Sequence, residues 1–169
     1  AALNLEGVWT RYQDAESVLA GVAETPQNEV TALLQKIYAA PIQEELVGQR
    51  IQEIKEAGMV CSVAVTPQNT KRLAPIAVEA GADVLIVQST VTTARHMSKS
   101  YKGLVFSEVV DSIDIPVIVG NCVTYHAALE LMETGVDGIL VGVGPGAACT
   151  SREVIVMGVP QVTATMDCA

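Results

Sequence analysis

The stretch GADVLIVQ, residues 81–88, sets the pattern from which the fold follows. Gly81 is typical of the residue that ends a helix, and the apolar run from Asp83 to Gln88 predicts a buried strand. The same order of helix, glycine and strand returns around Gly135. A chain that alternates in this way builds a parallel sheet whose strands are joined by right-handed helical crossovers.

Five strands are expected on this pattern, and most have the apolar composition of a buried parallel strand. They are residues 3–7, 60–65, 83–88, 116–120 and 138–143. Helices are expected between them, with starts and ends marked by capping residues, prolines and glycines. They begin after Asp14, at Thr25–Pro26, at Pro41, at Asn69 or Thr70, near Phe106 and at Thr124. Pro75 must lie in the early turns of its helix or kink it, because proline lacks an N–H.

Two α/β architectures fit this order of elements. One is an open, doubly wound sheet, and the other is part of a (β/α)8 barrel. A complete barrel takes ~250 residues, so a chain of 169 residues would supply only about five of the eight units. In both architectures ligands bind at the carboxyl ends of the strands.

The composition and charge suit one α/β domain and argue against several kinds of partner. Half of the residues are hydrophobic and the mean hydropathy is +0.37, which suits a buried sheet covered by helices. The formal net charge of −9 would repel DNA or RNA. No apolar run reaches the ~18 residues of a membrane span. Neither nucleic acid nor a membrane is therefore expected as a partner.

The cysteines indicate a reduced, cytoplasmic setting. None of the four forms C-x-x-C, which disfavours a zinc site and a disulfide framework. Cys61 and Cys122 lie in or next to predicted strands and are expected to be structural. The chain begins at Ala1 without Met and stops abruptly at Ala169, so we expect it to be a piece of a longer protein.

The stretch GVGPGAACTSRE, residues 142–153, places Cys149 in a glycine-rich loop after the last predicted strand. Two interpretations are open. A free cysteine is often a small apolar filler. Beside Arg152, in a partly exposed loop, it is equally well an activated nucleophile. The glycines would let backbone carbonyls converge on an ion, or N–H groups on a ligand.

Three further features have both a binding and a structural interpretation. Residues 142–147 match the dinucleotide fingerprint G-x-G-x-x-A, but that fingerprint belongs after the first strand of its unit, and Pro145 removes an N–H that a phosphate would need. Asn121, directly after a predicted strand, either binds a ligand or forms a turn. His96 and His126 are expected to be surface residues.

Three segments resemble one family of enzymes. Residues 141–152, followed by Gly158-Val159-Pro160-Gln161, resemble the catalytic-cysteine loop shared by IMP dehydrogenase and GMP reductase. Residues 115–124, IPVIVGNCVT, match the strand and turn before that loop. Residues 3–12, LNLEGVWTRY, narrow the likeness to an IMP-dehydrogenase-related branch. The resemblance covers essentially the whole chain, and it implies a (β/α)8 barrel, here incomplete, with about strands 2 to 6 present.

The resemblance implies an oxidoreductase of purine nucleotide metabolism that acts in GMP biosynthesis and is usually tetrameric. In IMP dehydrogenase the cysteine attacks C2 of IMP, hydride passes to NAD, and a covalent thioimidate is hydrolysed to XMP. Carried over, this makes Cys149 the nucleophile and places Ser151 beside the reacting purine. The backbone of Ala147 would lie near the IMP phosphate, and Asn121 is a second candidate for substrate binding.

The resemblance also implies a cofactor site and a cation site. Gly142, Val143 and Gly144 would line the nicotinamide side of NAD. The carbonyls of Gly144, Gly146 and Cys149 would hold a monovalent cation, usually potassium. Two departures bear on binding: many members carry Ser where this chain has Ala147, and an Asp that touches the nicotinamide ribose is replaced by Gln88.

The remaining expectations concern the extent of the chain. Residues 1–169 are expected to form a partial catalytic barrel, with residues 25–40 as a helical bridge where other members insert regulatory CBS domains. The first, seventh and eighth strands and the mobile flap are expected to be missing, so the isolated chain should not turn over. GMP reductase, which uses the same cysteine with NADPH, and a non-catalytic nucleotide-binding half-barrel are the alternatives.

Overall fold

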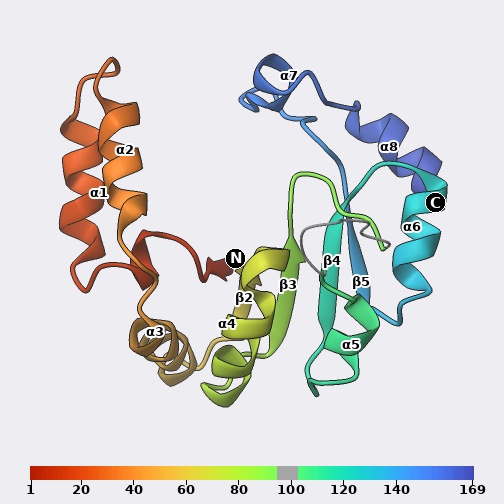
Figure 1. Cartoon of the computed structure of the whole chain (residues 1–169), viewed down its shortest axis with the longest axis horizontal. Coiled ribbons are helices and arrows are strands. Elements are labelled where there is room, and N and C mark those ends of the chain that lie inside the picture. Colours follow the sequence, from red (N-terminus) through yellow and green to blue (C-terminus); the bar gives the residue numbers. More distant parts are fainter. Residues whose placement is uncertain (95–102) are drawn as a thin grey trace.

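Five parallel strands form one sheet in the order β1-β2-β3-β4-β5 (Figure 1). The structure is a computed structural model that describes residues 1–94 and 103–169, so the histidine at position 96 lies outside the described residues. The strands are β1 Ala2–Asn4, β2 Ser62–Val65, β3 Val84–Gln88, β4 Val117–Cys122 and β5 Gly138–Val141. Each strand pairs with the next one along the chain, and only the β4–β5 pair has a register shift, between Gly120 and Cys122.

The helices follow the strands in alternation after an N-terminal helical segment. They are α1 Ala15–Glu24, α2 Val30–Ala39, α3 Glu44–Glu56, α4 Pro67–Glu79, α5 Phe106–Val110, α6 Tyr125–Met132, α7 Ser151–Val154 and α8 Gln161–Cys168, with a 3-10 turn at Val8–Thr10. Helix α4 lies against β2 and β3, α6 against β4 and β5, and α8 against α6 and β5. Among the described residues, none of the helices combines the length and apolarity needed to cross a lipid bilayer.

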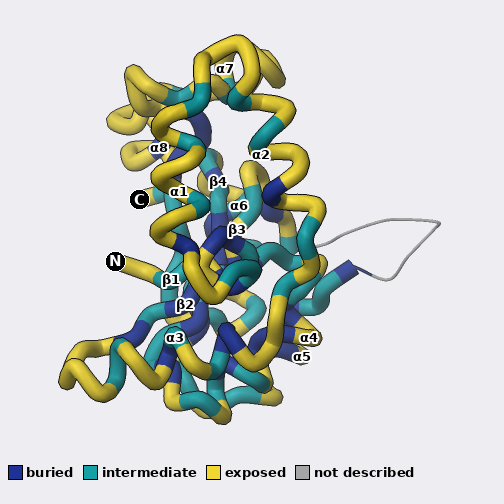
Figure 2. The backbone as a smooth tube through the Cα atoms, turned by 90° about the vertical axis from the view of Figure 1, so that its left-hand side faces the viewer, coloured by how far each residue is buried: buried dark blue, intermediate teal, exposed yellow. Residues whose placement is uncertain are grey.

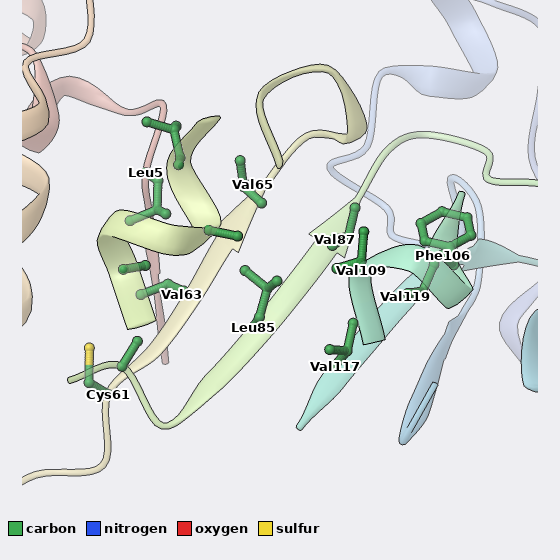
Figure 3. Packing of buried hydrophobic residues seen from close by; sticks show 14 of the residues in the cluster. Leu5, Cys61, Val63, Val65, Leu85, Val87, Phe106, Val109, Val117 and Val119 are labelled. Carbon is green, nitrogen blue, oxygen red and sulfur yellow. The ribbon is translucent and has the colours of Figure 1, made fainter. Parts of the chain in front are cut away.

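The strand order decides between the two predicted architectures. A doubly wound sheet reverses its strand order at a switch point, whereas here every strand neighbours its successor. On one face Val63, Leu85 and Val117 are fully buried beneath the helices (Figure 3). The opposite face is only partly covered. A parallel sheet with sequential strands and helices on one face is the wall of a partial (β/α)8 barrel.

Helices α1 and α2 form a hairpin that stands apart from the sheet (Figure 1). A small cluster of Val8, Ala15 and Ile37 holds it to the 3-10 turn. Asp14 caps α1 as expected, because its side chain accepts a hydrogen bond from the N–H of Ser17. Figure 2 shows that these two helices are largely exposed, whereas β2, β3 and β4 run through the buried core together with the inner faces of the helices that cover them.

The start of α4 differs from the prediction of a cap at residue 69 or 70. The helix begins at Pro67, after Thr66. The carboxylate of Glu6, which follows β1, accepts hydrogen bonds from the Thr66 backbone N–H at 2.5 Å and from the Asn69 side chain at 2.5 Å. Thr66 is the N-cap and Pro67 the first helical residue, which is a local start signal that the prediction overlooked. The Glu6 carboxylate holds this N-cap from far away in the sequence. Pro75 lies inside the helix, past the early turns where we expected it.

Other boundaries shift by a few residues. The second helix begins at Val30, not at Thr25–Pro26, because Thr25 ends α1 and residues 26–29 form a turn. Helix α3 starts at Glu44 rather than at Pro41, and β1 spans residues 2–4 rather than 3–7. Strand β4 continues past Gly120, the expected end, and β5 stops at Val141, before the expected residue 143.

Two aspartates fasten the amino ends of neighbouring strands in the same way. Asp83 donates its N–H to the carbonyl of Cys61, and its carboxylate accepts from the N–H of Cys61 at 2.7 Å. Asp137 donates to the carbonyl of Val117 and accepts from its N–H at 2.8 Å. Each aspartate therefore makes a reciprocal pair with the adjacent strand, and Asp83 also binds the ammonium of Lys55 at 2.7 Å.

We predict that Asp83→Asn lowers the free energy of unfolding at pH 7 and that this difference vanishes in acid. Hydrogen bonds from Lys55 and then from the backbone of Cys61 hold the pKa of the Asp83 carboxyl below its ordinary value. Such a group stabilises the native state above the unfolded-state pKa of ~3.9. That stabilisation is lost as the pH falls through the lower, folded-state pKa.

Urea titrations from pH 7 towards the acid limit of folding measure this difference. Glu56→Gln, which removes an exposed carboxylate at the end of α3, is the matched control. A difference between the Asp83 variant and the parent that stays constant down to the acid limit would contradict a role for the carboxylate charge.

Candidate active site

A polar cavity of about 500 Å³ opens at the carboxyl ends of the strands. Residues from the ends of β1 to β4 and from the loop after β5 line it. Among them are Asn4, Glu6, Gln88, Ser89, Asn121 and Ser151, together with the backbone of residues 142–144. Because the carboxyl ends of parallel strands lie at the same edge, residues as far apart in sequence as Ala2 and Ser151 face one space. This edge is where both predicted architectures placed a ligand.

A chain of side-chain amides joins the ends of three strands. The Nε2 of Gln88 donates to Oδ1 of Asn121 at 3.2 Å, and Nδ2 of Asn121 donates to the carbonyl of Gly142 at 2.8 Å. Asn121 lies within β4, so the turn interpretation is wrong. The two amides leave hydrogen-bonding atoms at the cavity wall that carry no charge.

Cys149 lies half-buried in the loop between β5 and α7. Its Sγ forms a hydrogen bond with Oγ of Ser151, at 3.2 Å. The hydroxyl and then the backbone N–H of Ser151 lower the pKa of the Cys149 thiol, and the charge of Arg152 adds a smaller contribution in the same direction. A lowered pKa increases the fraction of thiolate, which is the nucleophilic form of cysteine, and this favours the nucleophile over the apolar filler.

The other strand-end cysteines behave as structural residues, which confirms that prediction. Cys61 and Cys122 are each 1% exposed. Burial raises the pKa of the Cys61 thiol, and it raises the pKa of Cys122 to about 11, with a contribution from Cys168. The buried thiols therefore stay protonated, whereas Cys149 has the opposite shift.

Glycines allow the loop to fold back on itself. Gly142 and Gly144 have φ values of +130° and +58°, which side chains rarely adopt. A Cβ on Gly142 would lie 2.4 Å from Oε1 of Gln161, and one on Gly144 would lie 3.0 Å from the carbonyl oxygen of Met157. The glycines therefore admit a close approach of the segment that follows α7.

The carbonyls predicted to bind potassium already have a partner. The guanidinium of Arg152 donates from Nη1 to the carbonyl of Gly144 and from Nη2 to that of Gly146, the latter at 3.2 Å. Two of the three predicted ligands, the third being the Cys149 carbonyl, are thus occupied by a fixed positive charge. In this arrangement the carbonyls of Gly144 and Gly146 do not fit a potassium ion, because Arg152 already binds them. Among the described residues, no group of three His, Cys, Asp or Glu side chains could hold a metal.

The structure therefore brings most of the predicted site residues together. Gln88, Asn121, Ser151 and residues 142–144 line the cavity, and Cys149 joins them through Ser151. Ala147 is exposed and does not line the cavity.

Sequence reasoning missed eight residues of the cavity wall: Ala2, Asn4, Glu6, Ala64, Val65, Thr66, Ser89 and Thr90. Ser89 and Thr90 directly follow the predicted strand 83–88, so the rule that ligands bind at strand ends could have identified them. Nothing local marked Glu6, because the groups that it binds lie more than fifty positions away.

Comparisons with known proteins point to one family of enzymes. A family model described as the IMP dehydrogenase / GMP reductase domain matches residues 26–169. An uncharacterized oxidoreductase of Mycolicibacterium smegmatis is 36% identical over 173 residues, which cover 99% of this chain and 46% of that protein. The inosine-5'-monophosphate dehydrogenase of Cryptosporidium parvum is 44% identical over 96 residues, which cover 57% of this chain and 23% of that protein.

A solved structure agrees over nearly the whole chain. The crystal structure of an IMP dehydrogenase/GMP reductase-like protein from Corynebacterium glutamicum superposes with a TM-score of 0.88 at 37% identity, and the match covers 99% of this chain and 44% of that one. Fold and cavity thus define a barrel of the (β/α)8 class with its site at the strand carboxyl ends. The chain belongs to the IMP dehydrogenase / GMP reductase family. It spans less than half the length of the curated relatives that it matches.

We predict that Ser151→Ala raises the pKa of Cys149 and slows its alkylation at neutral pH. The hydroxyl of Ser151 is the largest cause of the lowered pKa, and each unit of increase removes about nine-tenths of the thiolate present at a pH below the pKa. Peptide-resolved mass spectrometry of iodoacetamide labelling across a pH series measures the midpoint.

Thr150→Ala is the matched control for this experiment. It removes the neighbouring hydroxyl, which makes no capping hydrogen bond, and should leave the midpoint unchanged. Equal midpoints for the parent and Ser151→Ala would show that the hydroxyl does not activate the thiol.

Proposed function

We propose that this chain carries the cysteine half of the catalytic barrel of an NAD-dependent oxidoreductase that converts IMP and water to XMP. One observation carries the proposal: Cys149, whose pKa is lowered, is hydrogen-bonded to Ser151, and Ser151 lines the cavity at the carboxyl ends of the strands. A thiolate there can attack the electron-poor C2 of a purine that enters the cavity. Cytoplasmic action and assembly into a homotetramer belong to the same proposal.

The proposed chemistry proceeds in two stages. Sγ of Cys149 forms a bond to C2, and hydride then leaves C2 with its electron pair. Water next adds to C2, the C–S bond breaks, and the sulfur leaves as the thiolate. Ser151 assists both stages, since its hydrogen bond stabilises negative charge on Sγ before attack and after release.

The residues that we assign to NAD offer backbone and a neutral amide to the flat nicotinamide ring. Gly142 and Gly144 present backbone without side chains to the cavity, and the neutral amide of Gln88 lies beside them through Asn121. NAD, when bound, would accept the hydride that leaves C2. The Val143 backbone completes that wall, while the Ala147 backbone would lie by the phosphate of the nucleotide.

The activity is proposed for the whole enzyme, of which this chain supplies five strands. Its curated relatives are more than twice as long as the matched segments. We propose that the isolated chain does not turn over, because elements beyond β1 and β5 are needed to close the cavity. We also propose that α1 and α2 span the place where other members insert CBS domains.

GMP reductase is the second candidate, because the matching family model covers both activities. The same thiolate would attack C2 of GMP and displace ammonia. Hydride from NADPH would then add to C2, the C–S bond would break, and the sulfur would leave as the thiolate. The two candidates separate in a coupled assay of the enzyme that contains this chain. IMP with NAD produces NADH in the first, whereas GMP with NADPH consumes NADPH in the second.

We predict that 6-chloropurine riboside monophosphate forms one covalent adduct, on Cys149. The sulfur attacks C6, chloride leaves, and the mass rises by that of the nucleotide less HCl. Intact-mass and peptide mass spectrometry locate the adduct, and excess IMP should suppress it. Cys149→Ser should abolish it, while Cys168, the other thiol that is not fully buried, serves as an internal control. An adduct spread over both thiols, or none while iodoacetamide still labels Cys149, would overturn the nucleotide assignment.

A further inference from the structure

The cysteine loop contains its own cation. Arg152, in α7, turns its guanidinium back onto the loop, where it donates hydrogen bonds to the carbonyls of Gly144 and Gly146. A guanidinium is planar and offers its N–H groups in a fixed fork, so it can hold two carbonyl oxygens at once. A monovalent cation that gathers loop carbonyls makes the same kind of contact with the same atoms.

Gly158 leaves room for the side chain of Arg152. A Cβ on Gly158 would lie 2.4 Å from Cγ and 2.9 Å from Cδ of Arg152, and 3.3 Å from the carbonyl oxygen of Gly144. Next to it, the N–H of Val159 donates to the carbonyl of Val143 at 2.9 Å, which keeps the two segments side by side. The absence of a side chain at residue 158 therefore leaves the room through which Arg152 reaches the loop.

The contact between Arg152 and the loop also involves the residue that carries the nucleophile. The carbonyl of Gly146 accepts from Arg152 and also from the backbone N–H of Cys149 at 3.1 Å. Arg152 thus fixes the turn that carries the thiol through backbone carbonyls and not through a hydrogen bond to the sulfur. A potassium ion on the Gly144 and Gly146 oxygens would stand against the guanidinium, and two like charges at such a separation repel.

We propose that the guanidinium of Arg152 takes the place of the monovalent cation in this loop, so that Cys149 keeps its reactive geometry without potassium. Arg152 is a positioning residue, because it acts on Cys149 through the loop carbonyls. The inference rests on the proposed function, since it concerns the loop of that reaction's nucleophile. It differs from the potassium dependence that the family resemblance implies.

The test measures the rate at which iodoacetamide labels Cys149 in the purified protein, with KCl or with choline chloride at equal ionic strength. The parent should react at the same rate in both salts. Arg152→Gln should react more slowly in choline chloride and recover in KCl, because potassium can then reach the vacated carbonyls. Arg72→Gln, which removes an equal charge from an exposed ion pair with Glu44, should behave like the parent.

Gly158→Ala provides a second variant that keeps the charge of Arg152 but displaces its side chain. It should acquire the same dependence on potassium, and it separates positioning from the electrostatic effect of Arg152 on the thiol. Circular dichroism verifies that each variant is folded.

A parent whose labelling rate rises in KCl would overturn the inference, and so would folded Arg152→Gln and Gly158→Ala proteins that show no potassium dependence. Because iodoacetamide requires no nucleotide site, this result is independent of the 6-chloropurine adduct, and the two proposals can fail separately.

Discussion

In-register pairing of parallel strands is the constraint on which the site depends. Because each strand aligns with its successor, Gln88 at the end of β3, Asn121 near the end of β4 and Gly142 just after β5 come within hydrogen-bonding distance. Reciprocal bonds from Asp83 and Asp137 fasten the opposite ends of neighbouring strands. A shift of one residue between β2 and β3 or between β3 and β4 would exchange the buried and cavity faces. The β4–β5 pair contains a register shift between Gly120 and Cys122, beside the Asn121 amide that bonds to Gly142.

Above that edge, the reactive loop is held by close backbone contacts. Gly142, Gly144 and Gly158 each stand where a Cβ would meet another atom at 3.0 Å or less. Their lack of side chains lets the segment after α7 lie on the loop and lets Arg152 reach two carbonyls. Backbone contacts and the guanidinium of Arg152 therefore position the thiol of Cys149, and the hydroxyl of Ser151 stabilises its negative charge.

Local patterns were sufficient for most of the helices and strands, and they failed where a partner was distant. Helix-closing glycines at residues 58, 81 and 135 all have positive φ, as their predicted role requires. The start of α4 was misplaced although Thr66-Pro67 is itself a local start signal, and only the hydrogen bond from the Thr66 N–H to Glu6 depends on a distant residue. Strand β4 was expected to end at Gly120, yet pairing of Cys122 with β5 extends it by two residues.

By itself, the sequence determined the alternation of helices and parallel strands, the glycine-rich loop around Cys149 and the family, because these depend on residue types at short spacings. Only the tertiary structure decided the barrel rather than the doubly wound sheet, since strand order depends on long-range pairing. It also decided which groups face the cavity and which partner the loop carbonyls take. The sequence indicated only that Arg152 is a positive charge near Cys149. The hydrogen bonds from its guanidinium to the carbonyls of Gly144 and Gly146 form only in the folded loop.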